Sequence, residues 1–244
     1  MIVIFGGTGA YQLQLGEYAQ VGERRVIETP YGEAAPLVQL SVEGKTVWFS
    51  ARHGETGFNR SAAFVNHRAN LWAARELGAT GILSWNSVGA IAPGLSVGQL
   101  VVPDDVLDMT RARVGSFNAF GAEHVPTEIP AGSAFAEDLR ARLVAACVAS
   151  GQPTATHGTY VCSEGPRLET AAEIMMFGWG GAAVVGMTLV PEVWLAAELG
   201  IPYASLCIVT NLATGRWQID PRREFGPVVG ITGLKITLAA ALGM

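Results

Sequence analysis

The feature that most constrains the fold is a repeated pattern, in which a short apolar run ends in glycine or small polar residues and a helical segment follows. Apolar runs of this length are typical of buried strands. They lie at residues 2–5, 46–49, 81–85, 99–103, 158–162, 182–186 and 203–209. Helical spacing is found at residues 65–78, 135–150, 171–177, 191–199 and 232–242. Strands that alternate with helices predict an α/β fold with a mostly parallel twisted central sheet flanked by helices on both faces.

The composition favours one large domain. Half of the 244 residues are hydrophobic and 15% are charged, so the chain can bury a sizeable core. No repeat, low-complexity stretch or linker divides the sequence, and we expect a single domain over residues 1–244. Because no signal-like segment and no run of about 18 uncharged apolar residues is present, we expect a cytoplasmic protein that makes no use of a membrane.

Charge and cysteine content argue against several classes of partner and cofactor. A net charge of −5 argues against a general nucleic-acid surface, which needs clustered positive charge. The three cysteines, Cys147, Cys162 and Cys207, have no paired spacing, which argues against a disulfide framework or a zinc site. We therefore expect buried cysteines and no metal.

Polar residues recur where the predicted strands end, which is the place for ligand contacts in an open α/β sheet. The clusters are Thr8, Arg52-His53, Asn86-Ser87, Glu164 to Arg167, Met187-Thr188 and Thr210-Asn211. A single cluster would mean little. Six such clusters in one chain predict a shared site.

Two of these clusters suit an anion. The turn Gly6-Gly7-Thr8-Gly9 presents backbone N–H groups, although it lacks the dinucleotide-binding pattern. Arg52 offers a planar fork of donors for phosphate or carboxylate, and His53 adds a donor or carries a proton. For the dipeptide alone, a surface arginine beside a packed histidine is an equal alternative.

Five motifs occur together in a recognisable order. They are Gly6-Gly7-Thr8-Gly9, Ala51-Arg52-His53-Gly54, Val65-Asn66 with Ala69-Asn70, Glu164-Gly165-Pro166-Arg167, and Gly186-Met187-Thr188 with Pro191-Glu192. In this order and spacing the chain resembles the trimeric purine nucleoside phosphorylases, in the branch that holds methylthioadenosine and methylthioinosine phosphorylases. The similarity runs from the first strand to about residue 215.

The resemblance implies an enzyme, a pentosyltransferase that uses inorganic phosphate to split a purine nucleoside into free base and ribose 1-phosphate. It implies a phosphate site formed by Thr8, Arg52, His53, Ser87 and Thr188. Such a reaction passes through a positively charged sugar, which a fixed anion stabilises, so no metal or organic cofactor is needed. The resemblance also implies a homotrimer or a trimer-based hexamer.

For the nucleoside, the resemblance implies contacts from several further residues. Met187 matches a methionine under the ribose, although its spacing also fits a core residue. His124 matches a histidine at the 5′ end of the sugar, and Phe117 is the candidate aromatic that a neighbouring subunit supplies. Leu168 and Ala213 complete the set.

Asn211 carries the most information about the base. It matches the position that faces purine N7 and the six-position, and we assign it a catalytic role with Arg52 and His53. An asparagine donates to O6 or N7, whereas a carboxylate would accept from a 6-amino group. The sequence therefore favours a 6-oxopurine, such as 5′-methylthioinosine or another 5′-deoxy nucleoside, unless Asn211 only caps the strand end.

The segment between His53 and Asn66 departs from the family pattern. Glu55 near a phosphate would repel it unless its side chain points away, and Arg60 could act as a further cation. The alternatives are therefore an adenine-type methylthioadenosine phosphorylase and a non-catalytic purine-nucleoside-binding protein. A hydrolase would have no use for the arginine at the phosphate site.

Overall fold

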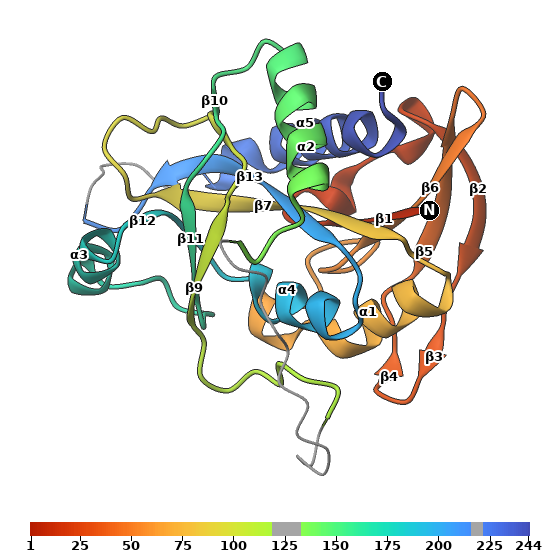
Figure 1. Ribbon diagram of the computed structural model, residues 1–244, viewed down its shortest axis with the longest axis horizontal. Helices are drawn as coiled ribbons and strands as arrows, with labels where there is room; N and C mark the ends of the chain where they lie inside the picture. Colours follow the sequence, from red (N-terminus) through yellow and green to blue (C-terminus); the bar gives the residue numbers. More distant parts are fainter. Residues whose placement is uncertain (119–132, 216–221) are drawn as a thin grey trace.

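An eleven-stranded sheet runs through the computed structural model, which describes residues 1–118, 133–215 and 222–244 (Figure 1). The strands are β1 (Ile2–Gly6), β2 (Gln20–Arg25), β3 (Glu28–Thr29), β4 (Gly32–Glu33), β5 (Leu37–Val42), β6 (Lys45–Ala51), β7 (Gly81–Ala90), β8 (Leu100–Val101), β9 (Asp105–Met109), β10 (Thr154–Ala155), β11 (Thr159–Ser163), β12 (Ala182–Gly186) and β13 (Tyr203–Leu212). The helices are α1 (His67–Glu76), α2 (Glu137–Ala149), α3 (Ala171–Trp179), α4 (Leu189–Glu198) and α5 (Arg222–Leu242).

The middle of the sheet is parallel, as the alternation of strands and helices predicts. The main path has the order β10-β8-β13-β7-β1-β6-β5-β2, and β12, β11 and β9 extend the sheet from β7. Parallel pairs join β13 to β7, β7 to β1 and β1 to β6. Antiparallel pairs occur between β5 and β6 and between β12 and β7. The prediction of a mostly parallel α/β fold is confirmed.

Helices cover both faces of the sheet because its central strands are apolar on both sides. In β1, Val3 and Phe5 belong to the core under α1 and α4, whereas Ile4 belongs to the core under α2 and α5. All three side chains are almost fully buried. Figure 1 shows α2 and α5 above the sheet and α1 and α4 below it. Successive residues of one strand therefore stabilise two separate layers.

Local capping explains where two helices begin. Asn66 precedes α1, and its side chain accepts a hydrogen bond from the Ala69 amide at 3.2 Å. Thr170 precedes α3 and forms a capping box with Glu173, in which each side chain bonds the other residue's amide. Both arrangements satisfy amides that have no partner inside a helix.

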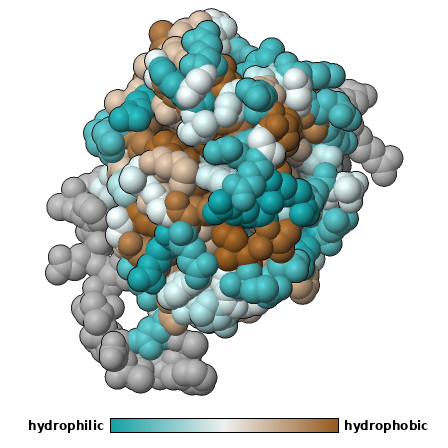
Figure 2. All heavy atoms as spheres, turned by 90° about the vertical axis from the view of Figure 1, so that its right-hand side faces the viewer, coloured by the Kyte–Doolittle hydropathy of each residue, from teal (hydrophilic) through white to brown (hydrophobic). Residues whose placement is uncertain are grey.

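The sheet ends at β2, an edge strand that carries charged side chains. All six residues of β2 are exposed, and Arg25 pairs with Glu23 at 2.7 Å. Figure 2 faces this side of the molecule, where hydrophilic residues cover much of the surface. A charged edge disfavours pairing with strands of other molecules. In the part of the chain that the structure describes, no helix has the length and apolarity to cross a membrane.

Three elements are longer than the sequence patterns predict. The strand predicted at 81–85 continues to Ala90, because β13 pairs along it and β12 pairs with its last two residues. Helix α5 begins at Arg222 rather than at residue 232. Helix α4 begins at Leu189, and Val190 inside it has non-helical backbone angles. The extension of β7 matters most, since Asn86 and Ser87 lie within a strand and not in a loop after it.

Candidate active site

A cavity of about 520 Å³ lies where β1, β6, β7, β12 and β13 end. Its wall brings together most of the predicted site residues: Thr8, His53, Ser87, Leu168, Met187, Thr188, Asn211 and Ala213. Tyr11, Phe58 and Val229 also line it. These residues come from segments that are far apart in the sequence, and the parallel sheet places their strand ends at one edge.

Glycines bring the turn after β1 close to β7. A Cβ atom on Gly7 would lie 2.3 Å from the carbonyl oxygen of Trp85, so only glycine fits there. The close approach places the Thr8 hydroxyl 2.8 Å from the Ser87 hydroxyl. Two of the predicted phosphate ligands therefore lie side by side at one end of the cavity.

A bulge in β13 shapes the opposite end. Val209 pairs with Val88 and Asn211 pairs with Gly89, so Thr210 is an extra residue between them. The Asn211 amide donates to the Leu212 carbonyl at 2.9 Å, and its oxygen lies 3.0 Å from the Thr210 hydroxyl. These bonds hold Asn211 at the cavity wall and leave one of its amide hydrogens for a ligand.

Glu169 lies in the same wall and was not among the residues predicted from the sequence. It is 7% exposed, and its carboxylate accepts a hydrogen bond from the Ser163 hydroxyl. The sequence holds one signal for it: the capping box uses Thr170 and Glu173, which leaves the preceding acid without a local role. A buried carboxylate in the wall of a cavity is suited to bind an N–H donor.

Arg52 does not line this cavity. Its side chain is buried, and Nη1 donates to a Glu192 carboxylate oxygen at 2.9 Å. Nη2 donates to the carbonyl oxygens of Phe5 and Trp85 at 2.7 and 3.1 Å. Arg52 borders a smaller cavity of about 280 Å³ instead, together with His53 and other polar residues. Arg52, the arginine predicted to bind phosphate, therefore lies behind the wall of the main cavity and borders the smaller cavity beside it.

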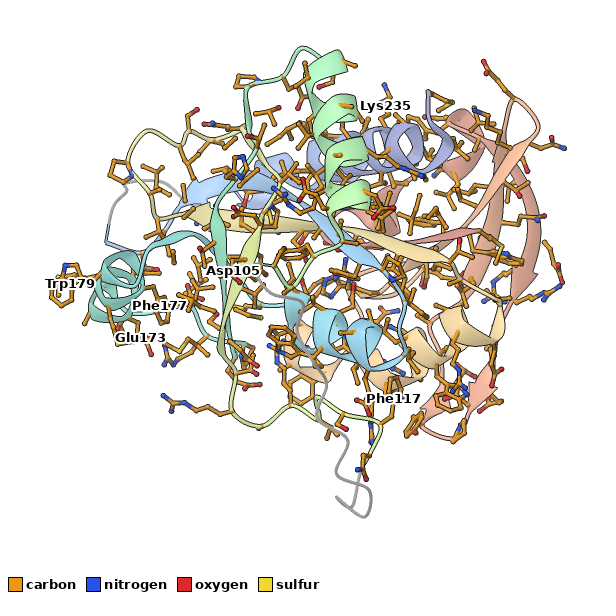
Figure 3. The ribbon with its side chains drawn as sticks, viewed as in Figure 1. Asp105, Phe117, Glu173, Phe177, Trp179 and Lys235 are labelled. Atoms are coloured by element: carbon orange, nitrogen blue, oxygen red, sulfur yellow. The ribbon has the colours of Figure 1, made fainter. Side chains whose placement is uncertain are left out.

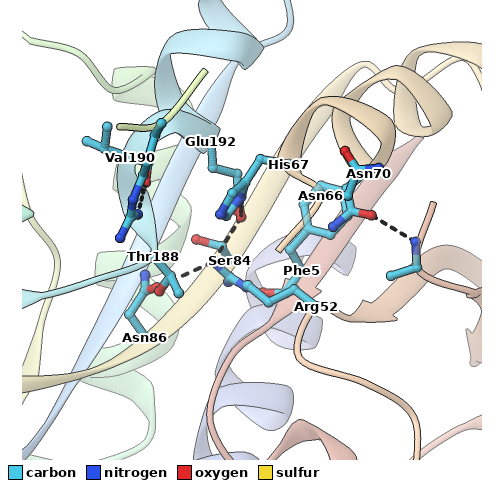
Figure 4. A network of polar contacts seen from close by, with 12 residues as sticks. Phe5, Arg52, Asn66, His67, Asn70, Ser84, Asn86, Thr188, Val190 and Glu192 are labelled. Carbon is cyan, nitrogen blue, oxygen red and sulfur yellow. Dashed lines mark hydrogen bonds and ion pairs between the residues drawn. The ribbon is translucent and has the colours of Figure 1, made fainter. Parts of the chain in front are cut away.

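A network of buried polar side chains connects Arg52 to the cavity (Figure 4). Asn86 lies between them: its oxygen accepts from Thr188 at 2.5 Å and lies 3.4 Å from Arg52 Nη1. Its amide nitrogen donates to Ser205 at 2.7 Å. Since Asn86 and Thr188 line the cavity, the arrangement of its wall depends on buried residues that do not line it themselves.

Glu192 is the anionic member of this network. Its second oxygen accepts from the Tyr203 hydroxyl at 2.9 Å, and the His67 ring lies 3.6 Å from the oxygen that Arg52 contacts. Burial alone would raise the pKa of Glu192, but Arg52, His67 and Tyr203 together outweigh that effect and hold it below its usual value. The carboxylate therefore stays ionised inside the core.

His53 is fixed in one protonation state. Its Nδ1 lies 2.8 Å from the Arg60 carbonyl oxygen, which only accepts, so Nδ1 carries the hydrogen. Burial, followed by the charge of Arg52, lowers the pKa of His53 to about 4. The ring is therefore neutral near pH 7, and Nε2 has only a lone pair to offer.

The unusual loop after His53 forms a rim of the cavity. The Phe58 ring stacks on the His53 ring at 5.0 Å between centroids, and its edge meets Tyr11 at 5.9 Å. Glu55 forms a two-pronged salt bridge with Arg24, with bonds of 2.7 and 3.1 Å, and this fixes its side chain on β2. Glu55 does not line the main cavity but borders the smaller one.

Phe117, a predicted nucleoside contact, is not in this cavity. Phe117 packs against Tyr31 and Trp72, with ring centroids 5.1 and 5.5 Å apart, and Figure 3 shows it on the side of α1 and α4. Its amide donates to the Glu198 carboxylate. This position agrees with the expectation that Phe117 serves a neighbouring subunit, which stays a prediction. His124 lies outside the described residues.

Comparison with known proteins identifies the family. A family model described as "Phosphorylase superfamily" matches residues 1–241. The chain belongs to this superfamily. Because the match spans almost the whole length, it covers every strand and helix that contributes to the cavity.

Curated relatives within the phosphorylase superfamily are similar over most of this chain. The probable S-methyl-5′-thioinosine phosphorylase of Pseudomonas syringae is 42% identical over 87% of this chain and 85% of its own. The 6-oxopurine nucleoside phosphorylase of Pyrococcus furiosus is 38% identical over 88% and 80%. The S-methyl-5′-thioadenosine phosphorylase of Nitrosopumilus maritimus is 37% identical over 86% and 78%.

Solved structures agree with the curated relatives. A double mutant of the adenosine/methylthioadenosine phosphorylase from Schistosoma mansoni, in complex with adenine, superimposes with a TM-score of 0.88. It is 28% identical, and the match covers 99% of this chain and 90% of that one. The predicted family, the fold class and the enzyme class, a pentosyltransferase of the nucleoside phosphorylase type, are confirmed.

Proposed function

We propose that this enzyme catalyses the phosphorolysis of a 6-oxopurine nucleoside, to give the free base and a ribose 1-phosphate. The nucleoside is 5′-methylthioinosine or another nucleoside whose sugar lacks the 5′ hydroxyl. The observation that carries the proposal is that one cavity has a buried carboxylate, Glu169, and an amide, Asn211, in its wall.

The two side chains suit the hydrogen-bonding groups of a 6-oxopurine. Such a base has an N1–H donor, with O6 and N7 as acceptors. Glu169 accepts from N1–H, and the free amide hydrogen of Asn211 donates to O6 or N7. Adenine would direct the N1 lone pair at the Glu169 carboxylate, and its 6-amino group would need an acceptor. The names of relatives that specify thioinosine or 6-oxopurine nucleosides support the same choice.

The other end of the cavity suits the co-substrate. The hydroxyls of Thr8, Ser87 and Thr188 and the ring of His53 lie around the region where phosphate would bind. Arg52 lies behind this wall, with its charge paired to Glu192; its Nη groups bond other acceptors, whereas its Nε–H has no partner among the described residues. A bound anion beneath the sugar stabilises the positive charge that develops as the base departs.

The sugar then occupies the space between these two ends, beside Met187. This side chain lines the cavity and also packs on Gly165, where a Cβ atom would lie 2.7 Å from the Met187 sulfur. A soft apolar side chain here fits the face of a ribose ring. Phe58, Tyr11 and Val229 provide apolar surface at the rim for a 5′ substituent without a charge.

The experiment measures base release from inosine, guanosine, adenosine and their 5′-methylthio forms, with and without phosphate. We expect phosphate-dependent release from the oxopurine nucleosides. Release that ignores phosphate would indicate a hydrolase, and a preference for adenosine forms would indicate the thioadenosine activity for which one relative is named. Nucleoside binding without turnover of any substrate would favour the non-catalytic alternative.

The predicted homotrimer belongs to the same proposal. In a trimer, Phe117 of one subunit would complete the sugar site of the next, which accounts for the position of Phe117 away from its own cavity. Light scattering of the purified enzyme tests this, since a mass of one chain would contradict it. The expectations of no metal or organic cofactor and of a cytoplasmic location stay predictions.

A further inference from the structure

Trp85 contacts three consecutive residues of the turn that follows β1. A Cβ atom on Gly6 would lie 2.7 Å from the indole ring, and one on Gly7 would lie 2.3 Å from the Trp85 carbonyl oxygen. The indole Nε1–H donates to the Thr8 carbonyl oxygen at 3.2 Å. The Trp85 side chain is fully buried, and a buried indole N–H needs an acceptor of this kind.

Helix α5 packs against both the indole and the turn. A Cβ atom on Gly233 would lie 2.5 Å from the indole ring, and one on Gly230 would lie 2.4 Å from the Gly9 carbonyl oxygen. The Phe49 ring stacks on the indole with 5.7 Å between the centroids. Because glycines let the helix backbone approach this closely, the indole is tightly enclosed and has little room to move.

The bond from the indole acts on a residue that lines the cavity. The Thr8 hydroxyl lies 2.8 Å from the hydroxyl of Ser87, which follows Trp85 by two positions in β7. The turn is thus joined to β7 twice through Thr8, once at its carbonyl oxygen and once at its side chain. Trp85 itself does not line the cavity, so it can affect a ligand only through these neighbours.

We infer that Trp85 is a positioning residue for phosphate. Its indole N–H holds the Thr8 carbonyl oxygen, and the Thr8 hydroxyl is thereby held where phosphate binds. The inference rests on the proposed function, because it concerns the co-substrate of that reaction. Without the indole N–H, the turn loses the bond that orients Thr8, whereas the side chains around the base and the sugar keep their contacts.

Steady-state kinetics of Trp85→Phe test this inference. Phenylalanine keeps an aromatic ring at this position but has no N–H group. We expect the KM for phosphate to rise about tenfold, as the loss of one hydrogen bond predicts. The kcat at saturating phosphate and the nucleoside Kd should change less than about twofold. Equal losses with both substrates, or an unchanged KM for phosphate, would overturn the inference.

A double-mutant cycle with Thr8 tests whether the indole acts through this residue. Thr8→Val removes the hydroxyl and keeps the shape of the side chain. In the Thr8→Val background, Trp85→Phe should lower kcat/KM for phosphate by less than about twofold, because the hydroxyl that it positions is already absent. Losses that multiply would mean that Trp85 acts independently of Thr8, which contradicts the role given to it.

Phe49→Leu is the matched control for packing. It removes the ring that stacks on the indole and leaves the bond between Trp85 and Thr8 in place. We expect a lower free energy of unfolding, with a KM for phosphate within about twofold of the wild-type value. A rise as large as that of Trp85→Phe would show that packing alone sets this KM, and the inference would be wrong.

Gly233→Ala keeps the inference testable if Trp85→Phe does not fold. The added Cβ atom would displace the indole ring and so weaken its bond to Thr8. The KM for phosphate should rise in this variant too. A folded Gly233→Ala enzyme with the wild-type KM for phosphate would count against the inference.

The proposed function fails separately from this inference. If base release ignores phosphate and titration calorimetry detects no phosphate binding, then phosphorolysis itself is wrong and the inference falls with it. If phosphate drives base release and Trp85→Phe leaves the KM for phosphate unchanged, only the inference is wrong.

Discussion

Arg52 Nη1 lies 2.9 Å from Glu192 Oε2, and both side chains are almost completely buried. The pair joins the end of β6 to the first turn of α4, two segments that lie behind the cavity wall. Its partners Asn86 and Tyr203 come from β7 and β13. One ion pair in the core therefore fixes the relative positions of four elements around the site.

Removing one member of this pair should be strongly destabilising. Glu192→Ala leaves the Arg52 charge buried without its counter-ion, and we expect a loss of about 3–5 kcal/mol in the free energy of unfolding. The double variant R52M/E192L should recover most of that loss, since neither charge remains. Urea unfolding of the wild type and of the two variants measures both effects. Single and double variants of equal stability would contradict the coupling.

Arg52 should also matter for phosphate. Arg52→Lys keeps the charge but replaces the fork that holds Asn86, Phe5 and Trp85 by one nitrogen. We expect kcat/KM for phosphate to fall about a hundredfold while the nucleoside Kd changes little. Steady-state kinetics and nucleoside titration separate the two. An unchanged phosphate dependence would mean that the field of Arg52 does not reach the anion.

Glu169→Gln tests the proposed hydrogen bond between Glu169 and the N1–H group of the purine. The amide still fills the space beside Ser163, but it no longer supplies a charged acceptor for N1–H. We expect kcat/KM for inosine to fall roughly thirtyfold, which corresponds to about 2 kcal/mol of lost transition-state stabilisation. The kcat/KM for adenosine should fall less. The ratio of the two substrates is the readout. A loss of equal size for both would indicate a structural role.

Asn211→Asp exchanges the donor for an acceptor at the cavity wall. The carboxylate can receive a hydrogen bond from a 6-amino group, so the preference should move towards adenine nucleosides by about tenfold or more. Competition between inosine and adenosine measures the shift. Asn211→Ala is the matched control, because it removes the donor without adding an acceptor and should lower both rates.

The buried His53 should make the stability of the folded enzyme decrease at acidic pH. The pKa of His53 falls to about 4 in the folded chain, from a usual value near 6.5, and the pKa of His67 is also lowered by burial. Between these two values the unfolded chain binds a proton that folded His53 does not, so stability is lost as the pH falls from about 6.5 to about 4. His53 alone should account for about 3 kcal/mol.

Measuring the free energy of unfolding at a series of pH values tests whether stability falls with pH as predicted. We expect the wild type to lose stability steadily below neutral pH and His53→Gln to lose less of it, because the variant has no group to protonate there. A wild-type stability that is flat, or that rises with acid, would contradict the neutral state of His53. That outcome would also weaken the assignment of Nε2 as an acceptor.

The sequence predicts the parts of the site that follow from strand ends. Thr8, Ser87, Thr188 and Asn211 follow apolar runs, and parallel strands bring the carboxyl ends of such runs to one edge. The same rule predicted the fold class. This rule needs only the local periodicity of the sequence and the requirement that crossover helices connect parallel strands.

The rest depends on contacts between distant residues. The orientation of Arg52 is decided by Glu192, which is 140 positions away in the chain and lies on another element. Glu169 enters the wall because the segment between β11 and α3 directs it there, and no periodicity marks that segment. The extension of β7 through Asn86 likewise follows from pairing with β12 and β13, which a single strand's pattern does not contain.

The extra residue in β13 lies just before Asn211, the residue of this strand end that lines the cavity. Up to Val209 the strand pairs in register with β7, and after Thr210 the pairing resumes one position later. Because side chains alternate between the two faces of a strand, this single residue decides which face Asn211 occupies. A deletion or insertion beside Thr210 would thus turn Asn211 to the other face of the strand and change the cavity wall without replacing any amino acid in it.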